Sequence, residues 1–160
     1  MKKYIGAFAS GLAGILTFVF LSLDGLFAKA SAGGLSTSTS TSGWDILKDD
    51  GSNIDGYTLY KIAVIAMIVI ACLLILSAVV IILKNAKVFK SKAKFNVINN
   101  VLLALFALAT ILAFVGACVM GGEMSVGETI KVTAGLGSWL NMVVGVVACA
   151  MGWMFARDKK

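Results

Sequence analysis

Four long apolar stretches alternate with short polar segments along the chain. The apolar stretches run from about residue 4 to 27, 62 to 83, 97 to 120 and 134 to 156. A helix needs about 20 apolar residues to cross the hydrocarbon core of a bilayer. Backbone amides inside lipid must be satisfied locally, and the alternating pattern of a membrane β-barrel is absent. The pattern therefore predicts an all-α chain, a single domain folded as a four-helix transmembrane bundle.

The longest polar segment, residues 28–61, is predicted to be an outer loop. Its first half contains Ser and Thr in strict alternation from Ser36 to Ser42. Three structures suit such a run: a flexible linker, a β-strand because of its threonine content, or a glycan-bearing stretch. We favour the linker, because small polar residues without apolar neighbours form no packed core.

The second half of this loop is predicted to be ordered. Trp44, Ile46 and Leu47 form an apolar patch among acidic residues, and tryptophan suits a membrane interface. We expect a short element that lies on the bundle or against a neighbouring protein, and we assign these three residues to outer-loop interaction. Residues 49–53 resemble a calcium loop only faintly, because the D-x-D-x-D-G spacing and the distal Glu are missing.

Composition supports a membrane protein. Hydrophobic residues make up 59% of the 160 positions, against about 45–50% in soluble domains. The mean hydropathy is +0.96. A soluble domain of this size could not bury so much apolar surface, whereas a bilayer accepts it on the outside of the fold.

The charges are divided between the two ends of the predicted spans. Three clusters hold ten basic residues and one acidic residue, a net charge of +9, whereas the rest holds four basic and seven acidic residues, a net charge of −3. The positive-inside rule therefore places both termini and the basic loop 84–96 in the cytoplasm. The clusters are Lys2 and Lys3; Lys84, Lys87, Lys90, Lys92 and Lys94; and Arg157, Lys159 and Lys160.

We interpret these lysines as topology signals, and the middle cluster as a lipid-facing basic loop attracted to anionic head groups. A nucleic-acid-binding protein would gather its basic residues on one solvated face, so we expect no nucleic-acid partner. We expect the chain to be an integral protein of a bacterial plasma membrane.

The first apolar segment has a second interpretation. The sequence Ala28-Lys29-Ala30 resembles the A-x-A cleavage site of a signal peptide. The apolar stretch is longer than the usual h-region of about 7–15 residues. We therefore expect a retained first helix.

Small residues at three- and four-residue spacing mark the predicted packing faces. In lipid, helices associate by close packing and interhelical hydrogen bonds. We expect these faces to pack within the bundle, and as the alternative to form contacts in a homo-oligomer or with a membrane-protein partner. The residues are Ala7, Gly11 and Gly14 in the first segment, and Ser138, Asn141, Gly145, Ala148 and Gly152 in the fourth.

Two groups of amides are candidates for polar contacts. Asn96, Asn99 and Asn100 lie near the cytoplasmic start of the third segment, where they could cap the helix or bond to neighbouring carbonyls. Asn141 lies inside the fourth segment, where an unpaired amide would be costly, so we expect it to bond across to another helix.

The chain offers no catalytic constellation. Segments two, three and four contain no Asp, Glu, Lys, Arg or His between their ends, and the chain has no His at all. Proton-coupled pumps, including small multidrug exporters, need an ionisable group at depth. The cysteines, Cys72, Cys118 and Cys149, form no CxxC pair and fall within apolar segments. We therefore expect no enzymatic activity, catalytic residue, cofactor or metal site.

Asp24 is the one ionisable residue inside an apolar segment. We interpret it as interfacial. If the first helix faced the axis of an oligomer, a ring of Asp24 side chains would form an acidic outer pore mouth that favours cations.

The layout resembles that of claudin-type and connexin-type tetraspan proteins, with four helices, both ends inside and a longer first outer loop. The resemblance is one of topology, because the first loop holds a single tryptophan, Trp44, and no cysteine. The sequence thus predicts a self-assembling, non-enzymatic membrane protein with a structural or interaction role. The alternative is a subunit of a homo-oligomeric channel.

Overall fold

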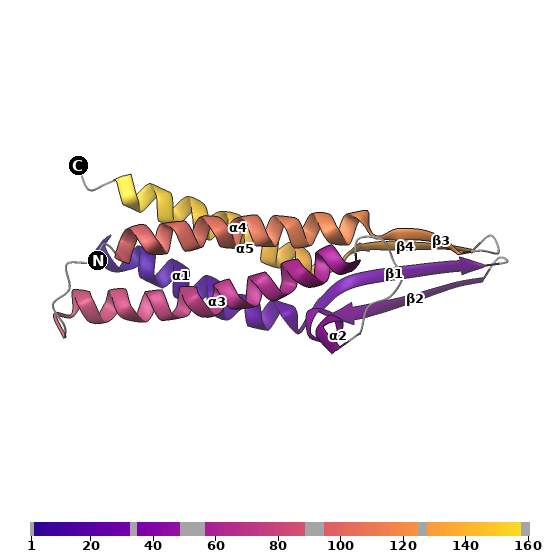
Figure 1. Ribbon diagram of the computed structural model, residues 1–160, viewed down its shortest axis with the longest axis horizontal. Helices are drawn as coiled ribbons and strands as arrows, with labels where there is room; N and C mark the ends of the chain where they lie inside the picture. Colours follow the sequence, from indigo (N-terminus) through magenta and orange to yellow (C-terminus); the bar gives the residue numbers. More distant parts are fainter. Residues whose placement is uncertain (1, 33–34, 49–56, 89–94, 125–127, 158–160) are drawn as a thin grey trace.

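A computed structural model describes residues 2–32, 35–48, 57–88, 95–124 and 128–157, and it consists of a helical bundle and a β-sheet arranged end to end (Figure 1). Four of the described helices are long and apolar enough to cross a membrane. This confirms the prediction of a mostly helical chain with four helices that could span a membrane. These helices are α1 (Lys2–Leu21), α3 (Tyr57–Asn85), α4 (Phe95–Val119) and α5 (Leu136–Arg157).

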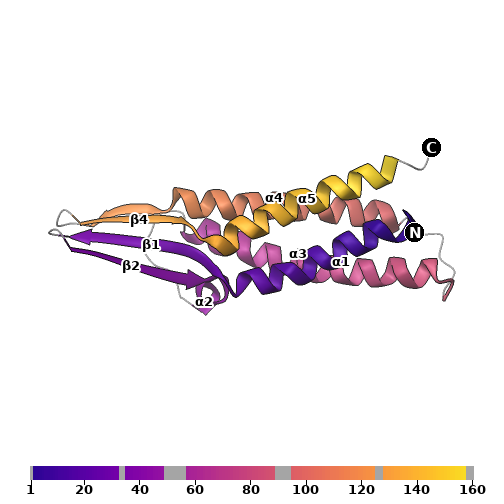
Figure 2. The same ribbon diagram turned by 180° about the vertical axis from the view of Figure 1, so that it is seen from behind.

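The four long helices form a ring of neighbours. Helix α3 packs against α1 and α4, and α5 packs against α4 and α1, whereas α1 and α4 touch only slightly across the bundle. The chain therefore runs up and down between adjacent helices. Seen from both sides, α1 begins, α3 ends, α4 begins and α5 ends at the same end of the bundle, and the sheet extends from the other end (Figures 1 and 2).

The sheet is the main departure from the all-α prediction, which is wrong for the outer segments. It comprises β1 (Asp24–Ala32), β2 (Leu35–Ser42), β3 (Gly121–Met124) and β4 (Glu128–Ala134). Its order is β2-β1-β4-β3, and every neighbouring pair is antiparallel. Each of the two outer segments thus forms a hairpin, and the hairpins join through β1 and β4.

The Ser/Thr run is a strand and not the linker that we favoured. Residues 35–42 form β2, which pairs with β1 from Ser42 opposite Asp24 to Leu35 opposite Ala32. The β-branched threonines favour an extended backbone. Because residues 36–40 are exposed on both faces of the sheet, small polar side chains replace the usual apolar and polar alternation.

Helix α1 ends six residues earlier than the apolar pattern predicted. The amides of Ser22 and Leu23 bond to the carbonyls of Val19 and Phe20, which tightens the last turn. Asp24 and Gly25 follow, and both are poor helix formers. The remaining apolar residues continue as β1, so Ala28-Lys29-Ala30 lies within a strand that pairs with β2 on one side and β4 on the other.

The base of the sheet is packed onto the outer end of the bundle. Leu26 and Val132 are each 7% exposed and belong to the bundle's main core cluster, with Ala28 and Ala134 packed against it. These residues alternate with exposed ones such as Phe27. Strand periodicity therefore turns one face of the sheet's base toward the core, and the rest of the sheet extends beyond it.

Candidate functional site

The four-stranded sheet extends beyond the bundle and exposes part of its surface (Figure 1). Residues 36–40 of β2 are all exposed, as is Lys29 of β1. The sheet order places β2 and β3 on the outside, and no further strand pairs with either among the described residues. The sheet therefore presents two open strand edges, each with a row of backbone hydrogen-bonding groups.

Charge is unevenly distributed over the strands. Lys29 and Lys131 are direct cross-strand partners in the two central strands. Glu123 lies in β3 and Glu128 in β4, whereas β2 has no charged residue. The edge strand β3 is thus acidic, the edge strand β2 is neutral, and each central strand carries one acidic and one basic residue.

Asp24, proposed as a possible outer pore mouth, is exposed and begins β1 opposite Ser42. It lies at the junction of bundle and sheet. The small residues that would have lined such a pore face elsewhere: Ala7 is 2% exposed and packs with Ala78 of α3. The exposed residues of α1 are large and apolar, among them Phe8, Leu12, Ile15 and Val19.

The predicted ordered element after β2 is α2 (Gly43–Lys48), and it lies against the bundle. Trp44 stacks on Phe18 of α1, with ring centroids 6.1 Å apart, and its indole N–H donates to Ser22 Oγ at 3.2 Å. Ile46 is 1% exposed, and Leu47 packs against the same core. The three residues assigned to outer-loop interaction therefore contact the protein's own α1 and core.

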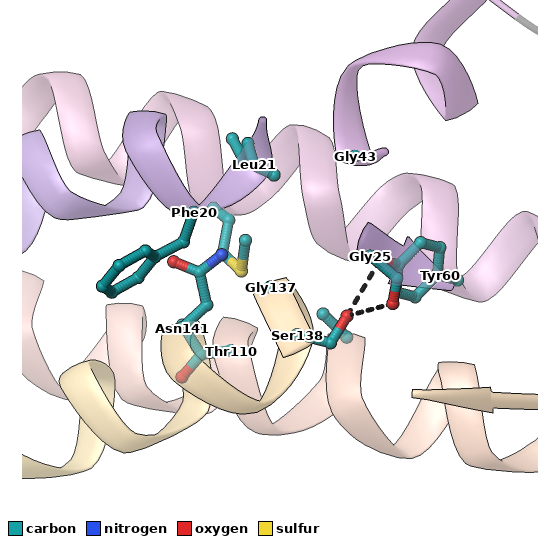
Figure 3. Close-up of a pocket in the computed structure, with 11 residues that line it drawn as sticks. Phe20, Leu21, Gly25, Gly43, Tyr60, Thr110, Gly137, Ser138 and Asn141 are labelled. Atoms are coloured by element: carbon teal, nitrogen blue, oxygen red, sulfur yellow. Dashed lines mark hydrogen bonds between the residues drawn. The ribbon is translucent and has the colours of Figure 1, made fainter. Parts of the chain in front are cut away.

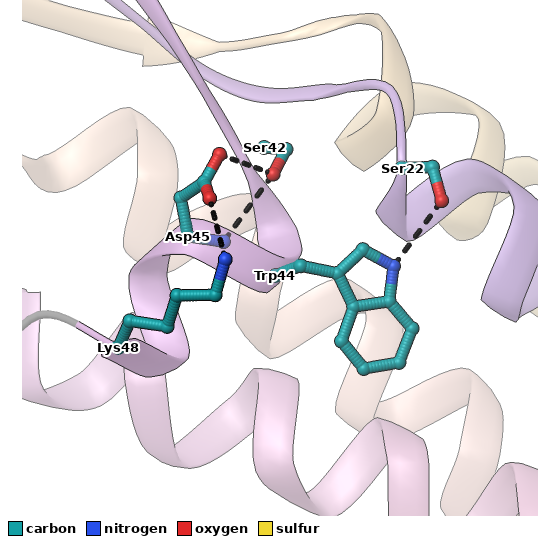
Figure 4. A network of polar contacts seen from close by, with 5 residues as sticks. All are labelled: Ser22, Ser42, Trp44, Asp45 and Lys48. Carbon is teal, nitrogen blue, oxygen red and sulfur yellow. Dashed lines mark hydrogen bonds and ion pairs between the residues drawn. The ribbon is translucent and has the colours of Figure 1, made fainter.

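A polar network fixes the start of α2 (Figure 4). The Ser42 hydroxyl donates to Asp45 Oδ2 at 2.7 Å, and the Asp45 amide donates back to Ser42 Oγ at 3.3 Å. Lys48 Nζ lies 3.3 Å from Asp45 Oδ1. The hydrogen bond from Ser42, assisted by Lys48, lowers the pKa of the Asp45 carboxyl. This reciprocal cap defines where the strand ends and the helix begins.

A second network joins the sheet to the bundle (Figure 3). Ser138 Oγ donates to the Gly25 carbonyl at 2.6 Å and lies 3.1 Å from the Tyr60 hydroxyl. Tyr60 is 2% exposed and Ser138 is 6% exposed. The contact links α3, α5 and the first residues of β1, so it holds the sheet at a fixed position on the bundle.

Beside this network is a cavity of about 10 Å³, lined in part by Thr110, Ser138 and Asn141. Its size is close to the space that one water molecule needs. Asn141 is 3% exposed, and its Oδ1 has no hydrogen-bond partner among the described residues. The prediction that Asn141 bonds across to another helix is therefore wrong for this oxygen.

A third network lies within the bundle. Asn99 Nδ2 donates to Ser10 Oγ at 2.7 Å, the Ser77 hydroxyl donates to Asn99 Oδ1, and Ser10 Oγ donates to the Gly6 carbonyl at 2.7 Å. Asn99 is 2% exposed and Ser10 is fully buried. The amide thus joins α1, α3 and α4 through side-chain hydroxyls, where the sequence suggested a cap or a bond to carbonyls.

The small-residue faces lie between helices of the same chain. A Cβ at Gly14 would come within 2.6 Å of Ile75 Cγ1, and one at Gly152 within 2.6 Å of Leu103 Cδ1. At Gly145 it would collide with the Thr110 side chain. Gly11 has room for a Cβ at 3.4 Å from Ala78, and Ala148 is 5% exposed. Through these small-residue faces, α1 packs closely against α3, and α5 packs closely against α4.

The basic end of the bundle is described in part. Lys84 Nζ lies 5.3 Å from the Phe95 ring centroid, and Lys87 adopts a positive φ of 62° just after α3. Lys90, Lys92 and Lys94 lie outside the described residues, as does the faint calcium-loop resemblance at 49–53. Within the described ranges, no three His, Cys, Asp or Glu side chains gather as a metal site would require.

Tyr60 and Ser77 are structural residues that the sequence reasoning missed. Tyr60 lies near the start of an apolar span, the position where an amphipathic ring often reaches a polar partner. No known protein-family model and no curated protein matches this chain.

Proposed function

We propose that this chain is a non-enzymatic, four-pass integral membrane protein that presents its four-stranded sheet on the outer side of a plasma membrane as an interaction surface. Its bundle supplies the anchor, and its networks hold the sheet in place. Both termini are cytoplasmic in this proposal.

The observation that supports this proposal is the position of the sheet. It lies at one end of the bundle, and the basic clusters belong to the other end. Helix α1 begins and α5 ends at the end opposite the sheet, where α3 also ends and α4 begins (Figure 1). The three basic clusters belong to those positions, and positive-inside orientation assigns them to the cytoplasm. The sheet then lies outside, where exposed strands meet soluble or membrane-bound partners.

The channel alternative has less support. The small residues of α1 pack against α3, and the exposed residues of α1 are apolar. A pore along α1 would therefore need a rearranged bundle. The interaction role uses surfaces that are already exposed.

Orientation is tested by labelling with a membrane-impermeant maleimide. We expect a Ser38→Cys variant to be labelled on intact cells, because Ser38 is exposed in β2. A Lys87→Cys variant, at the opposite end, should be labelled only after the membrane is permeabilised. The unmodified protein, whose cysteines lie in the spans, is the control. The reverse labelling pattern would overturn the proposed orientation.

Recognition by the sheet is tested with a photo-crosslinking amino acid. We expect the probe at exposed Ser38 to give discrete adducts of higher mass in intact cells. The same probe at exposed Val146 of α5, in the lipid-facing part of the span, is the matched control and should give none of those adducts. If the Ser38 probe gives no adduct although the protein is at the surface, the sheet is not an interaction surface.

A further inference from the structure

The two open edges of the sheet run in opposite directions. Strand β1 follows α1 and runs away from the bundle, and β2 returns to α2; β3 follows α4 and runs away, and β4 returns to α5. The outer strands are therefore β2, directed toward the bundle, and β3, directed away from it. The strands extend along the long axis of the bundle (Figure 2).

Copies in one membrane share the direction of the bundle axis. Two β2 edges, or two β3 edges, brought side by side in that membrane would be parallel. The β3 edge of one copy beside the β2 edge of the next is antiparallel, like every other pair in the sheet. Antiparallel pairs are slightly more stable per residue, so topology selects the β3-to-β2 contact.

The β2 edge lacks the features that usually prevent strand addition. Its sequence, Leu35–Ser42, contains no charge and no proline, and its only register shift is at the base, between Asp24 and Leu26 of β1. Proteins usually protect an open edge with lysine, proline, a bulge or a covering element. A neutral β2 also meets Glu123 of β3 without like-charge repulsion, whereas two β3 edges would bring glutamates together.

We propose that β2 binds β3 of a second copy of this chain in the same membrane, which continues the sheet from protein to protein. The inference rests on the proposed outward position of the sheet. Glu123, Thr129, Ser31 and Ser36 occupy one row across the sheet. Copies anchored in one membrane hold this row at the same height above the membrane. Glu123 of one copy therefore lies beside Ser36 of the next.

This contact is head-to-tail, so it leaves one β2 edge and one β3 edge open after each addition. Such contacts generate a closed ring or an open row of molecules, according to the angle between copies. The short β3 strand supplies few hydrogen bonds, and confinement in the membrane supplies the high effective concentration that short contacts need.

Disulfide crosslinking between two differently tagged copies tests the register. One copy carries Glu123→Cys and the other carries a single cysteine at one position from 36 to 40, both in a background with Cys72, Cys118 and Cys149 replaced by alanine. Adjacent strand residues face opposite sides of a sheet. We expect mixed dimers to be most frequent at 36, the position opposite Glu123. They should be at least about fivefold rarer at 37 and 39, which face the other side of the sheet, and at 40, which lies about 13 Å further along the strand.

A Thr37→Lys substitution in the β2 copy tests the edge itself, because the proposed register places residue 37 opposite Gly122 of β3. Thr37 is exposed, so the lysine should leave the fold intact while reducing mixed dimers about tenfold. Dimers joined through Ser36→Cys on both copies in place of Glu123→Cys would overturn the proposal in favour of β2-to-β2 pairing. Mixed dimers that show no maximum at position 36 would also overturn it. If impermeant labelling still marks Ser38→Cys, the proposed function survives that failure.

Discussion

Replacing Gly145 with leucine is expected to destabilise the bundle by about 1–3 kcal/mol, the usual effect of overpacking a close contact. A Cβ at this position would already collide with the side chain of Thr110 in α4. Thr110 is 1% exposed and donates to the Ala107 carbonyl at 2.8 Å, so it has little room to move. The free energy of unfolding is measured by titrating the protein in mixed micelles with a denaturing detergent.

Gly6 provides the matched control, because it is also a helical glycine in a predicted span but a Cβ there meets nothing within 4 Å. Gly6→Leu gains the same helix propensity, about 0.8–1 kcal/mol, without the collision. Its stability should therefore be unchanged or slightly higher. Gly145→Ala should also destabilise the bundle, because its Cβ meets the Thr110 side chain. Adding Thr110→Ala to Gly145→Ala should recover part of the lost stability. Equal stability of the Gly145→Leu and Gly6→Leu variants would show that α4 and α5 do not meet at Gly145.

Leucine in place of Asn99 and leucine in place of Asn141 are expected to change stability in opposite directions. Asn99→Leu removes the bonds to Ser10 and Ser77, which join three helices. Interhelical hydrogen bonds in membranes contribute about 0.6 kcal/mol on average and up to about 1.7. The variant should therefore lose about 1–3 kcal/mol in total.

Asn141→Leu removes a buried oxygen that has no partner. An unsatisfied buried polar atom costs about 1–3 kcal/mol, so the variant should be more stable by a similar or smaller amount. The adjacent cavity of about 10 Å³ gives the larger side chain some room. Both variants make the same change of residue, so their difference in melting temperature isolates the role of the partners. Destabilisation by both would show that Asn141 is satisfied in the membrane.

The apolar pattern predicted the spans well, because lipid imposes a simple requirement on length and polarity. The exception was the end of α1. Leu26 and Phe27 are as apolar as the residues before them, yet Asp24 and Gly25 end the helix and the chain continues as a strand. A hydropathy window averages over such a break, and the helix-forming tendencies of the two residues give the better signal.

The strands were harder to predict because their pairing is non-local. β1 and β4 are about 100 residues apart in sequence, and their register cannot be derived from either segment alone. The Ser/Thr run has a strand's threonines but no alternation of apolar and polar residues, since both faces are exposed. The partners of Asn99 and Asn141 likewise depend on helix rotation, which composition does not specify.

The direct continuation of helix into strand gives the protein a fixed reach. β1 has nine residues and follows α1 after a two-residue turn, and β4 leads into α5 through Gly135. At about 3.3 Å per residue, β1 extends roughly 30 Å. Because the base of the sheet is buried and bonded to the bundle, its tip is held at that height as a rigid spacer. A surface that touched only the tip would be kept about 30 Å from the end of α1.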